Sequence, residues 1–166
     1  PEADNGGISV VATTFAPYDF ARQLVGDMGT VSMLLPPGSE SHSYEPTPKD
    51  ILEIQNADVF IYVGGESDAW VTDVLESVGE GVRAVTLMDC VELLEEETVE
   101  GMEAEVHDHE HGEAGHEAEY DEHVWTSPRN AALICEKIAA ALCEADPANA
   151  SVYNANLAVY SAELAK

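Results

Sequence analysis

Apolar residues along this chain form short continuous runs that alternate with stretches of helical spacing. The short runs, rich in aliphatic and β-branched side chains, lie at residues 8–13, 31–35, 59–63 and 83–87. Apolar positions with the spacing of one helical face lie between them, at residues 17–25, 47–54 and 70–78. Strands that alternate with helices at this spacing predict right-handed crossovers and a parallel sheet. We therefore predict an α/β fold, with a four-stranded parallel sheet flanked by helices.

Helix-start signals recur in the second part of the chain. Ser127 precedes Pro128, and the apolar residues of the following stretch recur every four positions. Asp146 and Pro147 repeat the signal, and the next helical stretch runs to residue 166. Thr47, followed by Pro48 and Asp50, gives a similar signal earlier in the sequence. The pattern thus predicts two consecutive helices after residue 127, the second of them long.

Charge is distributed very unevenly. The chain has 33 acidic and 6 basic residues, for a formal net charge of -27. Residues 89–122 contain no lysine or arginine, and we predict a mobile, acidic loop at about residues 95–120. So few basic residues argue against binding to nucleic acid or to an anionic membrane surface.

Membrane-spanning segments, signal peptides and cysteine spacing say less about the function of the chain. No apolar run is long enough to span a bilayer, and residues 1–7 lack the features of a signal peptide. The sequence therefore fits either a cytosolic protein or one already processed. The three cysteines, Cys90, Cys135 and Cys143, lack the paired spacing of a metal knuckle or a redox motif. We expect them to be buried free thiols.

Histidine placement supplies the candidate chemistry. Five of the six histidines lie between His107 and His123, and the sixth, His42, precedes a predicted helix start. Neutral imidazole is the commonest protein ligand for zinc and later transition metals. His42 and His123 each fall in a loop at the edge where an α/β sheet presents its ligands. Metal binding is therefore the leading hypothesis.

Other candidate groups near this edge have simpler interpretations. Trp70 and Trp125 could form a ligand-stacking pair, but core packing is the favoured role for both. Glu40, Glu45 and Glu66 could supply oxygen ligands, but we interpret them as solvated or capping carboxylates.

Two segments carry a resemblance to a known family. One reads His-Ser-Tyr-Glu-Pro-Thr-Pro-Lys-Asp at residues 42–50, and the other Asp-Glu-His-Val-Trp-Thr-Ser-Pro at residues 121–128. Both resemble ligand segments of the zinc and manganese solute-binding proteins of bacterial ABC importers. The likeness extends to residues 14–20, to Tyr-Val-Gly-Gly at 62–65 and to Asp146-Pro147. It covers almost the whole chain, but only the amino-terminal lobe and connecting helix of a full receptor.

The resemblance implies a division of the chain and a set of ligands. Residues 1–145 would form the amino-terminal metal-binding lobe, and residues 146–166 would begin the long helix that connects two lobes. His42 and His123 would be the metal ligands, while a third histidine and often a carboxylate come from the second lobe. The acidic histidine-rich loop resembles that of zinc-specific members, and exchangeable secondary capture would fall to its four histidines, His107, His109, His111 and His116.

By the same resemblance, the function is that of a zinc-binding receptor, not an enzyme. It would act outside the cytoplasm, in the periplasm or lipid-anchored at the cell surface, and deliver Zn²⁺ to the membrane permease of an ABC importer. No organic small-molecule substrate and no nucleic acid partner are expected.

Alternatives remain open at this point. A receptor for manganese or iron would favour oxygen-rich ligation, and an adhesin is compatible with the family. A zinc-dependent hydrolase could use His42 and His123 with a carboxylate that activates water, although the sequence contains no HExxH-like pair.

Overall fold

A four-stranded parallel sheet organises the molecule. The computed structural model describes residues 6–91 and 122–166. The strands have the order β2-β1-β3-β4, and all neighbouring strands are parallel. Their bounds are Ile8–Ala12 for β1, Gly29–Met33 for β2, Val59–Tyr62 for β3 and Arg83–Thr86 for β4. The predicted α/β fold class is confirmed, with each strand within two residues of its expected start.

Strand β2 shows the largest difference from the predicted bounds. It begins at Gly29, which pairs with Ile8 of β1, whereas the apolar run alone starts at Val31. A Cβ atom at position 29 would overlap the carbonyl oxygen of Ile8, so only glycine permits this close pairing. Glycine carries no β-strand signal of its own, which is why the apolar pattern starts the strand too late.

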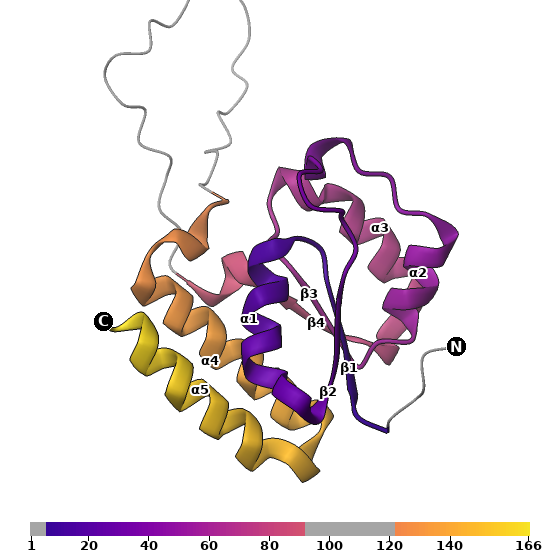
Figure 1. Cartoon of the computed structure of the whole chain (residues 1–166). Coiled ribbons are helices and arrows are strands. Elements are labelled where there is room, and N and C mark those ends of the chain that lie inside the picture. The colour runs from indigo at the N-terminus through magenta and orange to yellow at the C-terminus, as the bar shows by residue number, and fades with distance from the viewer. Residues whose placement is uncertain (1–5, 92–121) are drawn as a thin grey trace, which may run out of the picture.

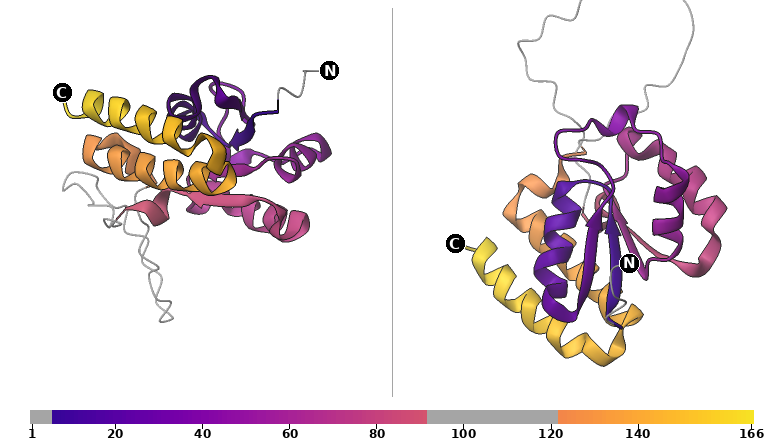
Figure 2. Two further views of the ribbon diagram at one scale, coloured as in Figure 1. Left: turned by 90° about the horizontal axis from the view of Figure 1, so that it is seen from below. Right: turned by 45° about the vertical axis from the view of Figure 1, so that its right-hand side comes forward.

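Helices cover both faces of the sheet (Figures 1 and 2). One layer contains α1 (Phe15–Val25), α4 (Pro128–Ala145) and α5 (Ala150–Leu164), and the other contains α2 (Pro48–Gln55) and α3 (Ala69–Val78). Side chains of successive strand residues point to opposite faces. Val59 and Ile61 therefore join the core under the first layer, while Phe60 joins the core under the second.

Of the three predicted helix starts, only the one at Thr47 has a side-chain cap. Thr47 and Asp50 form a reciprocal capping box at the start of α2. Asp146 accepts hydrogen bonds from Asn149 and from the hydroxyl of buried Tyr153, and these bonds lower the pKa of the Asp146 carboxyl. Asp146 and Ser127 make no side-chain cap, and the backbone carbonyl of Ser127 accepts from Ala131.

Helix α5 is attached to the rest of the fold along one side. Tyr153 is fully buried, and Asn156 donates a hydrogen bond of 2.9 Å to the carbonyl of Leu24 near the end of α1. In Figure 1, α4 and α5 run side by side, and the two helices contact each other along their length. The expected long carboxyl-terminal helix is therefore present and firmly packed.

The three cysteines are free. Burial raises the pKa of Cys90 to about 11 and that of Cys135 to about 12, so both thiols are protonated at neutral pH. None of the helices that the structure describes is long and apolar enough to cross a membrane.

Two leucines of α4 give a matched test of the core. Leu142 is fully buried beneath the first helical layer, whereas Leu133 on the same helix remains 36% exposed. We expect Leu142→Ala to lower the free energy of unfolding by about 2–5 kcal/mol and Leu133→Ala by much less. Urea unfolding followed by circular dichroism measures both. Equal losses would contradict the assignment of this face of α4 to the core.

Candidate metal-binding pocket

A pocket of about 590 Å³ opens at the carboxyl-terminal edge of the sheet. Segments that follow β1, β2 and β3, together with the segment that precedes α4, contribute its walls. Its polar and ionisable lining groups are Thr14, Ser39, Ser41, His42, Ser67, Asp68, Glu122 and His123. Parallel α/β sheets present their ligand sites at this edge, so the position agrees with the prediction from the strand pattern.

His42 sits in a short 3-10 turn, Ser41–Ser43, after β2. Two residues further on, Tyr44 fixes the end of this loop, because its hydroxyl donates to Asp50 at 2.6 Å and its ring meets Trp70 edge-on. Desolvation would raise the pKa of Asp50, but hydrogen bonds from Tyr44 and Thr47 outweigh it and lower the pKa. The residues that follow His42 in its motif therefore hold the loop to the start of α2.

His123 lies directly before a second 3-10 turn, Val124–Thr126. Val124 is buried in the core below, so it anchors the turn that carries the histidine. The ring of Trp125 lies 5.5 Å from that of His123, measured between centroids. Trp125 both lines the pocket and packs against the core, whereas Trp70 packs in the other core.

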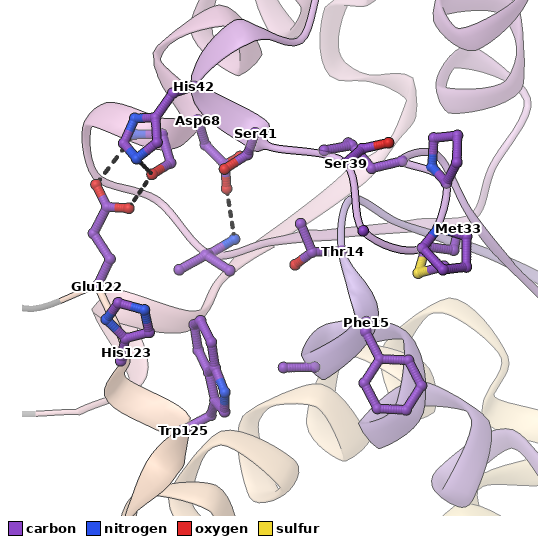
Figure 3. A pocket seen from close by; sticks show the side chains of 17 residues that line it. Thr14, Phe15, Met33, Ser39, Ser41, His42, Asp68, Glu122, His123 and Trp125 are labelled. Carbon is purple, nitrogen blue, oxygen red and sulfur yellow. Dashed lines mark hydrogen bonds between the residues drawn. The ribbon is translucent and has the colours of Figure 1, made fainter.

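Ser67 joins the two sides of the pocket by hydrogen bonds. Its backbone N–H donates to Oε1 of Glu122 at 3.1 Å, and its hydroxyl donates to Oε2 of the same carboxylate. Its Oγ also lies 3.2 Å from Nε2 of His42. A segment that follows β3 is thus connected to both histidine-bearing segments, as the dashed lines in Figure 3 show.

Asp68 holds the loop that carries Ser67. Only 4% of Asp68 is exposed, and its Oδ2 accepts from the backbone N–H groups of Val63 and Gly64 at 2.9 and 3.0 Å. Desolvation raises the pKa of this carboxyl, and the negative charge of Glu122 adds to the effect. The two amide donors stabilise the ionised form and partly offset the burial.

The structure brings His42 and His123 to the same pocket from positions 81 residues apart in the sequence. Figure 3 shows both imidazoles at one end of it, with Glu122 drawn between them. The expected secondary capture residues His107, His109, His111 and His116 lie outside the described residues. Glu40, Glu45 and Glu66 are exposed and are not among the residues that line this pocket.

Sequence reasoning did not single out Ser67, Asp68 or Glu122. Glu122 is part of the second motif but stands at a position where that motif tolerates any residue. Asp68 had a usable signal, since an acidic residue just after a strand and two glycines can accept from the exposed backbone amides. No pattern in the sequence pairs Ser67 with Glu122.

The arrangement can offer a divalent cation two imidazoles and a carboxylate, but not in one preformed cluster. Among residues 6–91 and 122–166, no three His, Cys, Asp or Glu side chains are grouped closely enough to hold a metal ion. Two imidazoles supply half of a tetrahedral zinc site. This part of the chain therefore provides an incomplete set of donors at an open pocket.

Known proteins with a similar sequence include a zinc uptake protein and a zinc-binding lipoprotein. The chain is 39% identical over 165 residues to the high-affinity zinc uptake system protein ZnuA of Bacillus subtilis, covering 98% of this chain and 50% of that protein. It is 34% identical over 160 residues to the zinc-binding lipoprotein AdcA of Streptococcus pneumoniae, covering 96% of this chain and 31% of that protein. The chain thus spans about a third to a half of the curated relatives it matches.

Solved structures of similar proteins include a zinc-bound and a manganese-bound protein. The crystal structure of Zn(II)-bound AdcA from Streptococcus pneumoniae matches with a TM-score of 0.76 at 29% identity, over 96% of this chain and 31% of that one. A Mn-bound periplasmic metal-binding protein from Candidatus Liberibacter asiaticus matches with a TM-score of 0.74 at 26% identity, over 94% of this chain and 52% of that one.

The family model described as "ZnuA: Zinc-uptake complex component A periplasmic" matches residues 10–166. The match includes every strand and helix around the pocket except the first two residues of β1. This chain therefore belongs to the ZnuA family of periplasmic zinc-uptake components.

Proposed function

We propose that this chain is the amino-terminal part of an extracytoplasmic zinc-binding receptor that delivers its metal to the permease of an ABC importer. The observation that carries the proposal is the convergence of His42 and His123 on one pocket at the carboxyl ends of the strands. The imidazole nitrogen is a preferred zinc ligand, and the chain carries a net charge of -27 that attracts cations.

The proposal includes the division of the chain. Residues 1–145 form the metal-binding lobe, and residues 146–166 form the first part of the helix that connects it to a second lobe. The turn at Asp146, with its hydrogen bonds from Asn149 and Tyr153, supports a boundary between two helices at this point. The second lobe would supply the remaining ligands, so the chain by itself binds zinc more weakly than a complete receptor.

Zinc is the favoured cargo over manganese or iron. Manganese prefers oxygen-rich sites, whereas the candidate ligands here are two imidazoles. Of the two carboxylates that line the pocket, Asp68 already accepts hydrogen bonds from two backbone amides. Isothermal titration with Zn²⁺ and with Mn²⁺ under the same conditions compares the two metals directly.

Substitution of either histidine tests the site. We expect His42→Ala and His123→Ala each to weaken the tightest zinc-binding step on the order of tenfold or more, because each removes one of two imidazole ligands. Isothermal titration calorimetry measures the step, and competition with a chromophoric chelator checks it. Replacement of exposed Glu45 by Gln, outside the pocket, serves as a control and should leave the step unchanged. If both histidine variants bound zinc like the unmodified chain, the proposed site would be wrong.

The four histidines of the acidic loop are proposed to capture zinc loosely. Simultaneous replacement of His107, His109, His111 and His116 by Gln removes their ligands while it keeps the acidic residues. We expect this variant to lose weak, additional zinc equivalents and to retain the tightest step. Titration calorimetry counts the equivalents, and an unchanged stoichiometry would exclude secondary capture by these residues.

Binding without catalysis is part of the proposal. We expect the zinc-loaded chain to show no turnover of ester or phosphoester substrates above that of free zinc, since its donors serve to hold a cargo and release it. A spectrophotometric assay with nitrophenyl substrates measures this. Turnover that disappears in the His123→Ala variant would instead support the hydrolase.

A further inference from the structure

We propose that Glu122 is a third cargo ligand of this lobe and that Ser67 holds it, together with His42, when no metal is bound. The proposal rests on the proposed function, because it assigns a new ligand to the same pocket. Glu122 lines the pocket that His42 and His123 line, and it is the neighbour of His123 in the sequence. A carboxylate oxygen is a common zinc ligand alongside imidazole nitrogens.

The present partners of Glu122 are groups that a metal ion can replace. Both carboxylate oxygens accept hydrogen bonds from one residue, Oε1 from the backbone N–H of Ser67 and Oε2 from its hydroxyl. Among the described residues, no lysine or arginine forms an ion pair with Glu122. A divalent cation between the two imidazoles would offer this carboxylate a full opposite charge in exchange for two hydrogen bonds.

Ser67 also contacts His42, and the number of hydrogens on the serine hydroxyl determines which of the two side chains is the donor. A serine hydroxyl has one hydrogen, and here it is donated to Glu122. Toward His42, Ser67 Oγ therefore acts as the acceptor, and Nε2 of His42 is the donor at 3.2 Å. In this state Nε2 carries a hydrogen and cannot ligate a metal ion.

Metal binding through His42 Nε2 must therefore break the contact with Ser67. A zinc ion lies about 2.0–2.1 Å from a ligating nitrogen, along the direction in which the N–H points in the hydrogen-bonded ring. The carboxylate of Glu122 must likewise leave Ser67 before it can reach the metal ion. One hydroxyl thus restrains two prospective ligands of the metal-free pocket.

The backbone around Ser67 is shaped for close approach by Glu122. Gly65 has a φ of 75°, and a Cβ atom at this position would overlap Oε1 of Glu122. Asp68 fixes the same loop through the amides of Val63 and Gly64. Ser67 is therefore presented to Glu122 by a rigid turn, and the carboxylate is the partner that moves when metal binds.

Two variants test the proposal because it predicts effects of opposite sign. We expect Glu122→Gln to weaken zinc binding by about tenfold to a hundredfold, since the amide is a poor zinc ligand but keeps the size of the side chain. We expect Ser67→Ala to tighten zinc binding by about tenfold, because the metal no longer competes with a hydrogen bond to a charged group. Competition with a chromophoric chelator gives both dissociation constants.

Controls separate ligation from charge and from folding. Glu66→Gln removes the same charge from an exposed carboxylate beside Ser67 and should leave the zinc dissociation constant within about twofold of the unmodified value. Urea unfolding of each variant shows that the fold is retained. Glu122→Asp keeps the charge but shortens the side chain, and it should weaken zinc binding in the same direction as Glu122→Gln.

The outcomes distinguish this inference from the function on which it rests. An unchanged dissociation constant for Glu122→Gln overturns the ligand role. Weaker binding by Ser67→Ala also overturns the proposal, because it would mean that Ser67 orients the ligands for metal and does not compete with it. If His42→Ala and His123→Ala leave zinc binding unchanged, the proposed function itself fails.

Discussion

Parallel pairing of β1 with both of its neighbours is the constraint on which the rest of the molecule depends. Because β2 and β3 hydrogen-bond to opposite edges of β1 in the same direction, three strands end at one edge of the sheet. The loops that follow them carry Thr14, His42 and Ser67 to a common pocket. An antiparallel neighbour would have sent one of these loops to the far end of the sheet. The direction of the strands therefore determines where the pocket forms, and the side chains of the loops then determine its chemistry.

The pattern of apolar residues was sufficient to predict the architecture. Runs such as residues 59–63 are buried on both faces, as a strand between two helical layers must be, and the structure confirms β3 there. The helix-start signal at Thr47 was equally reliable, because Thr47 and Asp50 together form both hydrogen bonds of a capping box. The signal at Ser127 was incomplete, and the helix begins there without the side-chain hydrogen bond. Gly29 begins a strand only because another backbone passes too close for a side chain, which a single sequence does not reveal.

The pocket was predictable in its location and in two of its side chains, but not in its hydrogen bonding. His42 and His123 stood out because of their residue type and their place before helix starts. Ser67 and Glu122 are common residues 55 positions apart, and their contact depends on how β3 and the start of α4 are brought together. Asp68 is buried among backbone amides that become donors only once the turn after β3 has formed. Tertiary structure therefore decides how the candidate ligands are restrained.

Gly65 is constrained both by its backbone conformation and by the side chain of Glu122 that packs against it. Its positive φ and the closeness of the Glu122 carboxylate mean that two independent requirements, one of conformation and one of space, exclude other residues there. If a homologue carries a short side chain at the position of Glu122, the requirement for space disappears while the requirement for conformation remains. Asparagine, which tolerates a positive φ better than most residues, would then become acceptable at position 65. The two positions are therefore expected to covary during the evolution of the family.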